Sequence, residues 1–171
     1  MKKIILCGYM ASGKSTIARL LAQALGITHL DLDEIIENQT GKTVSQIFSE
    51  DGEIQFRKKE HLVLKEIVNN DEAFVLSLGG GTPCYANNHE FLKRDDVVSV
   101  YLKTSIQEIV ARLTNETTQR PMLSNLKGEE LEEFVAKHLF DRSYYYMQAK
   151  HKVTTDGKTP ENIVNEIVSL F

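Results

Sequence analysis

The residues with the clearest chemistry lie near the start of the chain, in the run GYMASGKS from Gly8 to Ser15. This run fits the pattern G-x-x-x-x-G-K-[S/T], whose glycines let the backbone wrap around phosphates. Its amide N–H groups would donate to phosphate oxygens, and a helix that starts there would add the positive end of its dipole. Lys14 would neutralise the β- and γ-phosphates, and the Ser15 hydroxyl would ligate Mg²⁺. The motif predicts a site for a nucleoside triphosphate and magnesium. The residues that we expect to bind it are Ala11, Ser12, Gly13, Lys14, Ser15 and Thr16.

Two carboxylates, Asp31 and Asp33, lie at the carboxyl end of the second predicted strand. Residues i and i+2 of a strand face the same side, so both side chains would point into one space beside the phosphate loop. One carboxylate would then support the magnesium ion, and the other would face an acceptor hydroxyl. The alternative is a strand-to-helix turn in which Asp33 caps the next helix.

Two arginines and a glycine triplet are ambiguous when each is taken alone. Arg57 lies at the border of the apolar stripe of a predicted helix, and Arg142 follows an aspartate, so each is better explained as a surface charge. The triplet Gly79, Gly80 and Gly81 ends the third predicted strand. It indicates unusual dihedrals or the close approach of a ligand, with a loose turn as the alternative.

Short aliphatic runs alternate with longer helical patterns along the chain, and this alternation is typical of a parallel sheet with helices on both faces. The predicted strands cover residues 3–6, 29–32, 74–78, 97–102 and 152–155. The predicted helices cover residues 15–25, 56–68 and about 105–113, the last with a capping box of Ser105 and Glu108, and a final helix starts at Thr159-Pro160. In such sheets the ligand lies beyond the carboxyl ends of the strands.

One segment, residues 114–128, is polar and has no period. At about 15 residues it is longer than ordinary connections, which favours a mobile lid that carries Arg120; a disordered surface excursion is the alternative.

Taken together, these residues resemble the shikimate kinase family. The family pattern is a P-loop, D-x-D, a helix with F-R-x-x-E, then L-G-G-G, R-P-L-L in a lid, and R-x-x-x-Y. This chain supplies these motifs in order at Gly8–Ser15, Asp31 with Asp33, Phe56–Glu60, Leu78–Gly81, Arg120–Leu123 and Arg142 with Tyr146. No later motif is specific alone, but six in sequence are. Ala11 stands where many members have glycine, so the loop is expected to be less permissive there.

The resemblance implies an α/β protein with the three-layer P-loop NTPase fold of the nucleoside-monophosphate-kinase type. Its five-stranded parallel sheet would have the order 2-3-1-4-5, with a substrate-binding helical region over about residues 33–60 and the lid at 114–128. It also implies the ATP-dependent, Mg²⁺-requiring phosphorylation of the shikimate 3-hydroxyl, in aromatic amino-acid biosynthesis.

Several residues take roles from the resemblance. The shikimate-binding residues would be Asp33, Arg57, Gly79, Gly80, Gly81 and Arg142. Lys14 and Arg120 would stabilise the transferring phosphoryl group, and Asp33 would act on the acceptor. Ser15 would ligate magnesium, with Asp31 helping through water.

Composition sets the remaining expectations. A chain of 171 residues with 20 basic and 24 acidic side chains, and so a formal net charge of −4, predicts a single domain with no nucleic-acid or membrane partner. No run of 18 apolar residues is present, and we expect a cytoplasmic monomer. We expect an inert thiol at Cys84, because no nearby basic residue is apparent. The alternatives to shikimate phosphorylation are a gluconate kinase-like enzyme and a non-catalytic nucleotide-sensing module.

Overall fold

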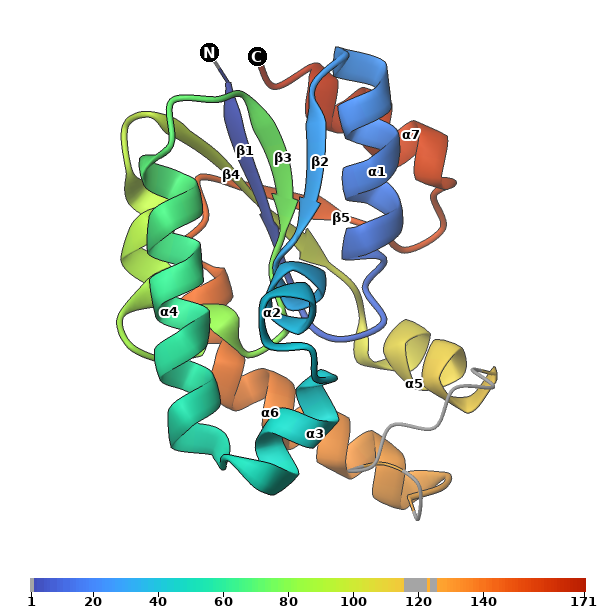
Figure 1. The fold of residues 1–171 in the computed structure, drawn as a ribbon. Helices are drawn as coiled ribbons and strands as arrows, with labels where there is room; N and C mark the ends of the chain where they lie inside the picture. Colours follow the sequence, from blue (N-terminus) through green and yellow to red (C-terminus); the bar gives the residue numbers. More distant parts are fainter. Residues whose placement is uncertain (1, 116–122, 124–125) are drawn as a thin grey trace.

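The computed structural model describes residues 2–115, 123 and 126–171. Its centre is one parallel sheet of five strands in the order β2-β3-β1-β4-β5 (Figure 1). The strands are β1 (Lys3–Cys7), β2 (Thr28–Asp31), β3 (Phe74–Ser77), β4 (Val97–Lys103) and β5 (His151–Thr154). The predicted fold class and strand order are confirmed, and no predicted strand end differs from the observed end by more than one residue.

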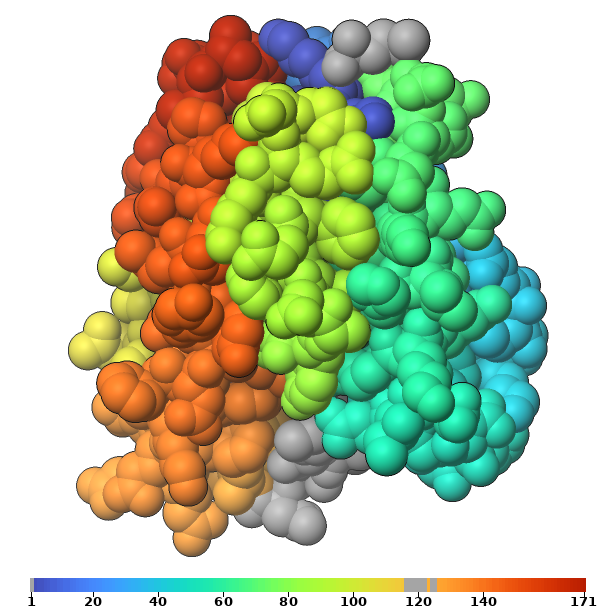
Figure 2. Space-filling model, turned by 90° about the vertical axis from the view of Figure 1, so that its left-hand side faces the viewer, coloured from blue at the N-terminus to red at the C-terminus, as the bar shows by residue number. Residues whose placement is uncertain are grey.

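Helices cover both faces of the sheet, with α1 and α7 on one side and α4 and α6 on the other (Figure 1). The helices are α1 (Lys14–Leu25), α2 (Leu32–Thr40), α3 (Val44–Glu50), α4 (Glu53–Asn69), α5 (Ile106–Asn115), α6 (Glu129–Tyr146) and α7 (Pro160–Val168). Two 3₁₀ helices, η1 (Thr82–Cys84) and η2 (Asn88–Lys93), follow β3. Figure 2 shows this 3₁₀ segment, in yellow-green, lying between α4 and α6. None of the helices in the described part of the chain is both long and apolar enough to span a bilayer.

The central strand explains the layered core. Every residue of β1 is buried, and its side chains alternate between the two faces. Ile4 and Leu6 pack with α1 and α7, whereas Ile5 and Cys7 pack with the opposite helices. A strand that is covered on both faces must be apolar throughout, which is why this run shows no polar alternation.

Helix ends follow local chemistry, although one predicted cap is only half formed. At α7 the Thr159 side chain accepts from the Asn162 N–H as predicted. At α5 the Ser105 hydroxyl accepts from the Glu108 N–H, but the Ser105 N–H donates to Asp156. The Glu108 carboxylate is therefore left to pair with a side chain further along its own helix.

The short helices α2 and α3 were not predicted individually. The α3 start is a complete capping box, in which the Gln46 N–H donates to the Thr43 hydroxyl and the Gln46 side chain accepts from the Thr43 N–H. Both helices connect β2 to α4, and they turn the chain back across the carboxyl end of the sheet (Figure 1).

Candidate active site

The phosphate loop requires its two glycines. Gly8 has a φ of 154°, and a Cβ there would lie 2.8 Å from the Leu102 carbonyl oxygen. Gly13 has a φ of 90° directly before α1. These conformations exclude ordinary side chains and leave the backbone of the loop open toward its cavity.

Lys14 is the first residue of α1 and its side chain folds back over the loop. Its ammonium donates to the carbonyl oxygens of Gly8 at 2.8 Å and Tyr9 at 2.9 Å, and only 9% of the residue is exposed. These two bonds hold the positive charge at the centre of the loop. The predicted phosphate-binding residues Ala11, Gly13, Lys14, Ser15 and Thr16 line one cavity of about 370 Å³. Ser12 is buried and is not part of that lining.

Asp31 joins the loop to the sheet. Its Oδ2 accepts from the Ser15 hydroxyl at 2.8 Å and from the Ser77 hydroxyl at 2.9 Å. Its Oδ1 accepts from the Glu34 N–H and so caps α2. A hydroxyl beside a carboxylate, both facing a phosphate cavity, suits Mg²⁺, which takes few protein oxygens and keeps water and phosphate ligands. Among the described residues no cluster of three or more histidine, cysteine or acidic side chains forms a metal cage.

Asp33 does not lie on the strand as we expected. The strand ends at Asp31, and Asp33 belongs to the first turn of α2, so the i, i+2 argument was wrong. The capping role that the alternative gave to Asp33 falls to Asp31 instead. Asp33 nevertheless lines the same cavity as the phosphate loop. Burial, followed by the nearby charges of Glu60 and Asp31, raises the pKa of Asp33 to about 6, although Lys14 acts in the opposite direction.

The glycine triplet is where the scattered polar residues meet. A Cβ on Gly79 would lie 3.1 Å from Oδ1 of Asp33. A Cβ on Gly81 would lie 2.8 Å from Nη2 of Arg57 and 3.2 Å from Nη2 of Arg142. None of the three glycines has a positive φ, so close approach rather than unusual dihedrals explains them. The structure brings one carboxylate and two guanidinium groups to the same short turn.

Arg57 is not a surface charge, as its helix pattern alone suggested. Only 15% of its side chain is exposed, and its Nη1 donates to Oε1 of Glu60 at 2.9 Å. Glu60 is 1% exposed, and its Oε2 accepts from the Thr82 hydroxyl at 2.9 Å. The guanidinium carbon also lies 3.9 Å from the ring centre of Tyr85. A buried ion pair and an aromatic ring therefore fix its position.

A longer hydrogen-bond chain continues behind this pair. The Asn88 side chain donates to the Thr82 carbonyl oxygen at 3.0 Å, and its Oδ1 lies 2.7 Å from Nδ1 of His61. Asn88 and Thr82 are completely buried. This network was not predicted, because its members come from α4, η1 and η2 and no spacing pattern in the sequence links them.

The helix α6 supports the site from the other side. The Tyr146 hydroxyl donates to the Gly80 carbonyl oxygen, and Arg142 lies one turn earlier on the same helix. One turn before that, Nδ1 of His138 lies 3.0 Å from the Tyr9 hydroxyl of the phosphate loop. Burial and the nearby Arg142 lower the pKa of His138. One face of α6 thus contacts both the loop and the triplet.

Cys84 is nearer to basic side chains than the sequence indicated. Arg142 and Arg57 both act to lower its pKa, so the expectation of no basic neighbour was wrong. Burial outweighs them and raises the pKa of this thiol to about 11. The thiol is protonated at neutral pH, for a different reason from the one expected.

The predicted lid is only partly described. Arg120 and most of residues 114–128 lie outside the described residues. Within the segment, Leu123 and Leu126 are partly buried against the core beside α6, and the Leu126 N–H donates to the Leu123 carbonyl oxygen.

Comparisons with known proteins agree with this arrangement. Residues 10–171 match the sequence model of a family described as shikimate kinase. The chain belongs to the shikimate kinase family. A shikimate kinase of Flavobacterium psychrophilum is 54% identical over 167 residues, which cover 98% of this chain and 97% of that protein.

Solved structures of shikimate kinases have the same fold. The structure from Bacteroides thetaiotaomicron has a TM-score of 0.90 and 34% identity, covering 99% of this chain and 97% of that one. The structure from Acinetobacter baumannii, described as a complex with shikimate, has a TM-score of 0.86 and 34% identity, covering 99% of this chain and 92% of that one. A gluconokinase of Sinorhizobium meliloti has a TM-score of 0.60 at 16% identity, covering 98% of this chain and 90% of that one. At this identity the similarity shows a common fold only.

Proposed function

We propose that this member of the shikimate kinase family transfers the γ-phosphoryl group of ATP to the 3-hydroxyl of shikimate. The products are shikimate 3-phosphate and ADP, and the reaction belongs to aromatic amino-acid biosynthesis. The observation that carries the proposal is the meeting of Asp33, Arg57 and Arg142 at the glycine triplet, beside the phosphate loop. This set suits an acceptor with a carboxylate at one end and a hydroxyl at the other.

The two arginines anchor the acid end of the acceptor. A guanidinium group presents paired N–H donors that match the two oxygens of a carboxylate. Arg57 and Arg142 approach the same glycine, Gly81, from α4 and α6, so an acid seated at the triplet has a donor on each side. Nη1 of Arg57 donates to Glu60, and Nη2 is the guanidinium atom closest to the Cβ position of Gly81, at 2.8 Å.

Asp33 acts on the hydroxyl. With a pKa of about 6, its carboxylate is mostly ionised at neutral pH and still basic enough to accept a proton. It would accept a hydrogen bond from the 3-hydroxyl and orient the oxygen toward the γ-phosphate, and would take the proton as the P–O bond forms. Phosphoryl transfer is catalysed mainly by positioning and charge neutralisation, so orientation is the larger part of this role.

The phosphate loop holds the nucleotide. Its N–H groups would donate to phosphate oxygens, and the Lys14 ammonium would exchange its carbonyl partners for the β- and γ-phosphates. Magnesium, when bound, would neutralise charge on the phosphates, held by the Ser15 hydroxyl and through water by Asp31. Arg120 would add a further positive charge from the lid and help exclude water.

A coupled assay of ADP release tests the proposal against its alternatives. We expect release with shikimate to exceed release with gluconate or with no acceptor by at least about 100-fold. Preference for gluconate would show that the protein is a gluconate kinase-like enzyme instead. The likeness to the Sinorhizobium meliloti gluconokinase is one of fold alone and does not favour that alternative. ATP binding without acceptor-dependent release would favour the nucleotide-sensing module and overturn the proposal.

A further inference from the structure

The residue that follows the glycine triplet, Thr82, is held by its backbone on both sides. Its N–H donates to the Gly79 carbonyl oxygen at 3.1 Å, and its carbonyl oxygen accepts from the Asn88 side chain at 3.0 Å. Its hydroxyl donates to Oε2 of Glu60 at 2.9 Å. Thr82 and Asn88 are completely buried, so water does not compete for these bonds. The turn that forms the triplet therefore fixes where the Thr82 hydroxyl stands.

The buried carboxylate of Glu60 is divided between two donors. Its Oε1 accepts from Nη1 of Arg57 at 2.9 Å, and its Oε2 accepts from the Thr82 hydroxyl. Only 1% of Glu60 is exposed, and a buried carboxylate oxygen without a donor is costly. With Thr82 on the second oxygen, Glu60 contacts Arg57 through Nη1, and Nη2 lies 2.8 Å from the Cβ position of Gly81.

Loss of the Thr82 hydroxyl would change how Glu60 uses Arg57. The second oxygen would need another donor, and the guanidinium group of Arg57 is the charged donor that Glu60 already contacts. A guanidinium fork matches both oxygens of one carboxylate, so Glu60 would turn into a two-point pair with Arg57. The donors of Arg57 would then serve a carboxylate of the protein rather than the acid end of an acceptor.

We propose that Thr82 is a positioning residue for the acceptor: its hydroxyl occupies one oxygen of Glu60 and so keeps a donor of Arg57 free for the acceptor's carboxylate. Thr82 acts through Glu60 and Arg57 and not on the reacting atoms. The inference rests on the proposed function in taking shikimate as the acceptor. Its consequences concern the binding of an acid and leave the binding of nucleotide unchanged.

The test substitutes Thr82→Val, which keeps the shape of the side chain and removes its donor. We expect KM for shikimate to rise about tenfold. This value is the lower end of the effect of losing a charge-assisted hydrogen bond, because the guanidinium group is redirected and not removed. KM for ATP and the calorimetric dissociation constant for MgADP should change less than about twofold. Thr82→Ser, which restores the hydroxyl, should stay within about twofold of the natural chain in KM for shikimate.

Two further measurements show whether Thr82 acts through Arg57. In an Arg57→Lys background, Thr82→Val should raise KM for shikimate less than about threefold, because lysine has no fork for Glu60 to withdraw. A shikimate analogue without its carboxylate should bind the natural chain and Thr82→Val equally. An equal cost of Thr82→Val in both backgrounds would overturn the proposal, and so would weaker binding of the analogue to the variant.

Thr104→Val is the matched control, because Thr104 is a buried threonine whose hydroxyl lies 2.6 Å from that of Thr155. It should leave KM for shikimate within about twofold of the natural chain. A Thr82→Val protein that melts with the natural chain and keeps its KM for shikimate would overturn the proposal. If Thr82→Val does not fold, Thr82→Cys has a weaker donor of similar size and should raise KM about threefold over Thr82→Ser. No difference between these two variants would also overturn it.

A crystal structure of Thr82→Val separates this inference from the proposed function. If the natural chain fails to phosphorylate shikimate, the proposed function falls, but the structure still decides whether Thr82 controls Arg57. Glu60 in two-point contact with Arg57 would support that control. Glu60 still contacting Arg57 through Nη1 alone would overturn it.

Discussion

The proposed nucleotide side and the proposed acceptor side of this site are built in opposite ways. The phosphate loop and the start of α1 come from nine consecutive residues, 8–16, and their donors are largely backbone groups. The acceptor side uses side chains from α2, α4 and α6, which meet only at the glycine triplet. A binding surface made of backbone tolerates side-chain changes around it, whereas one made of side chains depends on the networks that hold them. The two sides should therefore respond differently to substitution.

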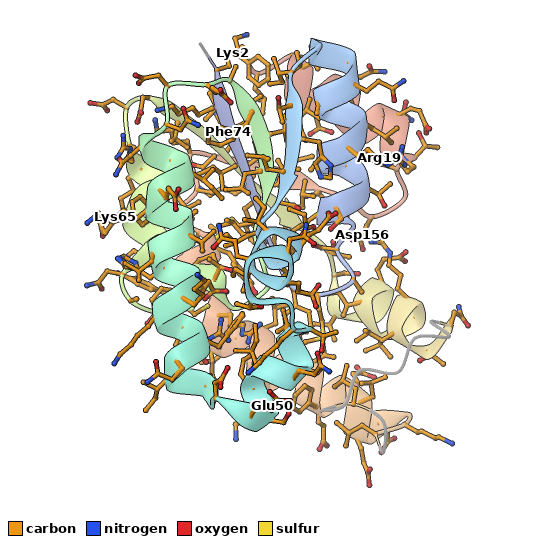
Figure 3. The ribbon with its side chains drawn as sticks, in the orientation of Figure 1. Lys2, Arg19, Glu50, Lys65, Phe74 and Asp156 are labelled. Atoms are coloured by element: carbon orange, nitrogen blue, oxygen red, sulfur yellow. The ribbon has the colours of Figure 1, made fainter. Side chains whose placement is uncertain are left out.

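The largest effect should come from the one side chain at the centre of the nucleotide side. Lys14→Ala is expected to abolish measurable turnover while the fold survives, because the ammonium balances phosphate charge and does not fill the core. Steady-state kinetics measure the loss of turnover, and a thermal melt shows whether the fold is retained. Lys65→Ala, at an exposed lysine of α4, is the control and should keep full activity (Figure 3). Substantial turnover in a folded Lys14→Ala protein would contradict the assignment of the loop.

On the acceptor side, Asp33→Asn should lower kcat by about 10²- to 10⁴-fold, because the amide keeps the shape but loses the charge that orients the hydroxyl and accepts its proton. KM for ATP should change little. An effect limited to KM for ATP would mean that Asp33 acts on the nucleotide, and would contradict its assignment to the acceptor side.

Arg57→Lys and Arg142→Lys should each raise KM for shikimate about 10- to 150-fold, with a much smaller change for ATP. Lysine cannot reproduce the two-point contact, and losing a charge-assisted hydrogen bond costs about 1.5–3 kcal/mol. Kinetics at saturating ATP measure the effect, with Arg19→Lys, at an exposed arginine of α1, as the matched control (Figure 3). A shikimate analogue without its carboxylate should bind the natural chain and both variants almost equally poorly. Tight binding of that analogue to the natural chain would show that the arginines do not hold an acid.

The pH dependence sharpens the same comparison. Because the pKa of Asp33 is raised to about 6, kcat/KM for shikimate should fall tenfold per pH unit below that value and level off above it. Binding of MgADP, which does not use Asp33, should show no such break. A flat profile down to pH 5 would mean that Asp33 orients the hydroxyl without accepting its proton.

The smallest effect concerns stability. The pKa of Asp33 in the folded protein, about 6, exceeds its ordinary value of 3.8, so its ionised form destabilises the fold. This penalty is fully present above pH 6 and absent below about pH 4. Two pKa units correspond to about 3 kcal/mol, which partial exposure reduces to about 1–2 kcal/mol. Asp33→Asn should therefore be more stable than the natural chain at pH 8 in urea unfolding, and equal to it near pH 3.5. Equal stability at both values would contradict the raised pKa.

The contrast between consecutive residues on the nucleotide side and distant side chains on the acceptor side also determines what the sequence could predict. The phosphate loop was predictable because its function depends on neighbours in the chain, and a strand before it and a helix after it sufficed. The sequence placed Asp33 beside the phosphate loop for a wrong reason, since Asp33 lines that cavity from the first turn of a helix rather than from a strand.

The residues that hold Arg57 were beyond local reasoning. Thr82 and Asn88 lie 22 and 27 positions from their partners on α4, and neither residue type nor spacing marks them. Their contribution arises when burial forces every polar atom to find a partner, which happens only after the helices pack. The bond between Tyr9 and His138 spans 129 positions and was missed for the same reason.

The two ends of the described chain lie side by side, far from the site. The Lys2 ammonium stands 4.2 Å from the ring centre of Phe171, at the end of the sheet opposite α2 and α3 (Figure 1). A short peptide could join these ends, and new ones could be opened in the exposed turn at residues 70–72, between α4 and β3. In such a circular permutant the glycine triplet would be synthesised before the phosphate loop, and the same three-dimensional site would have its motifs in a different order along the chain.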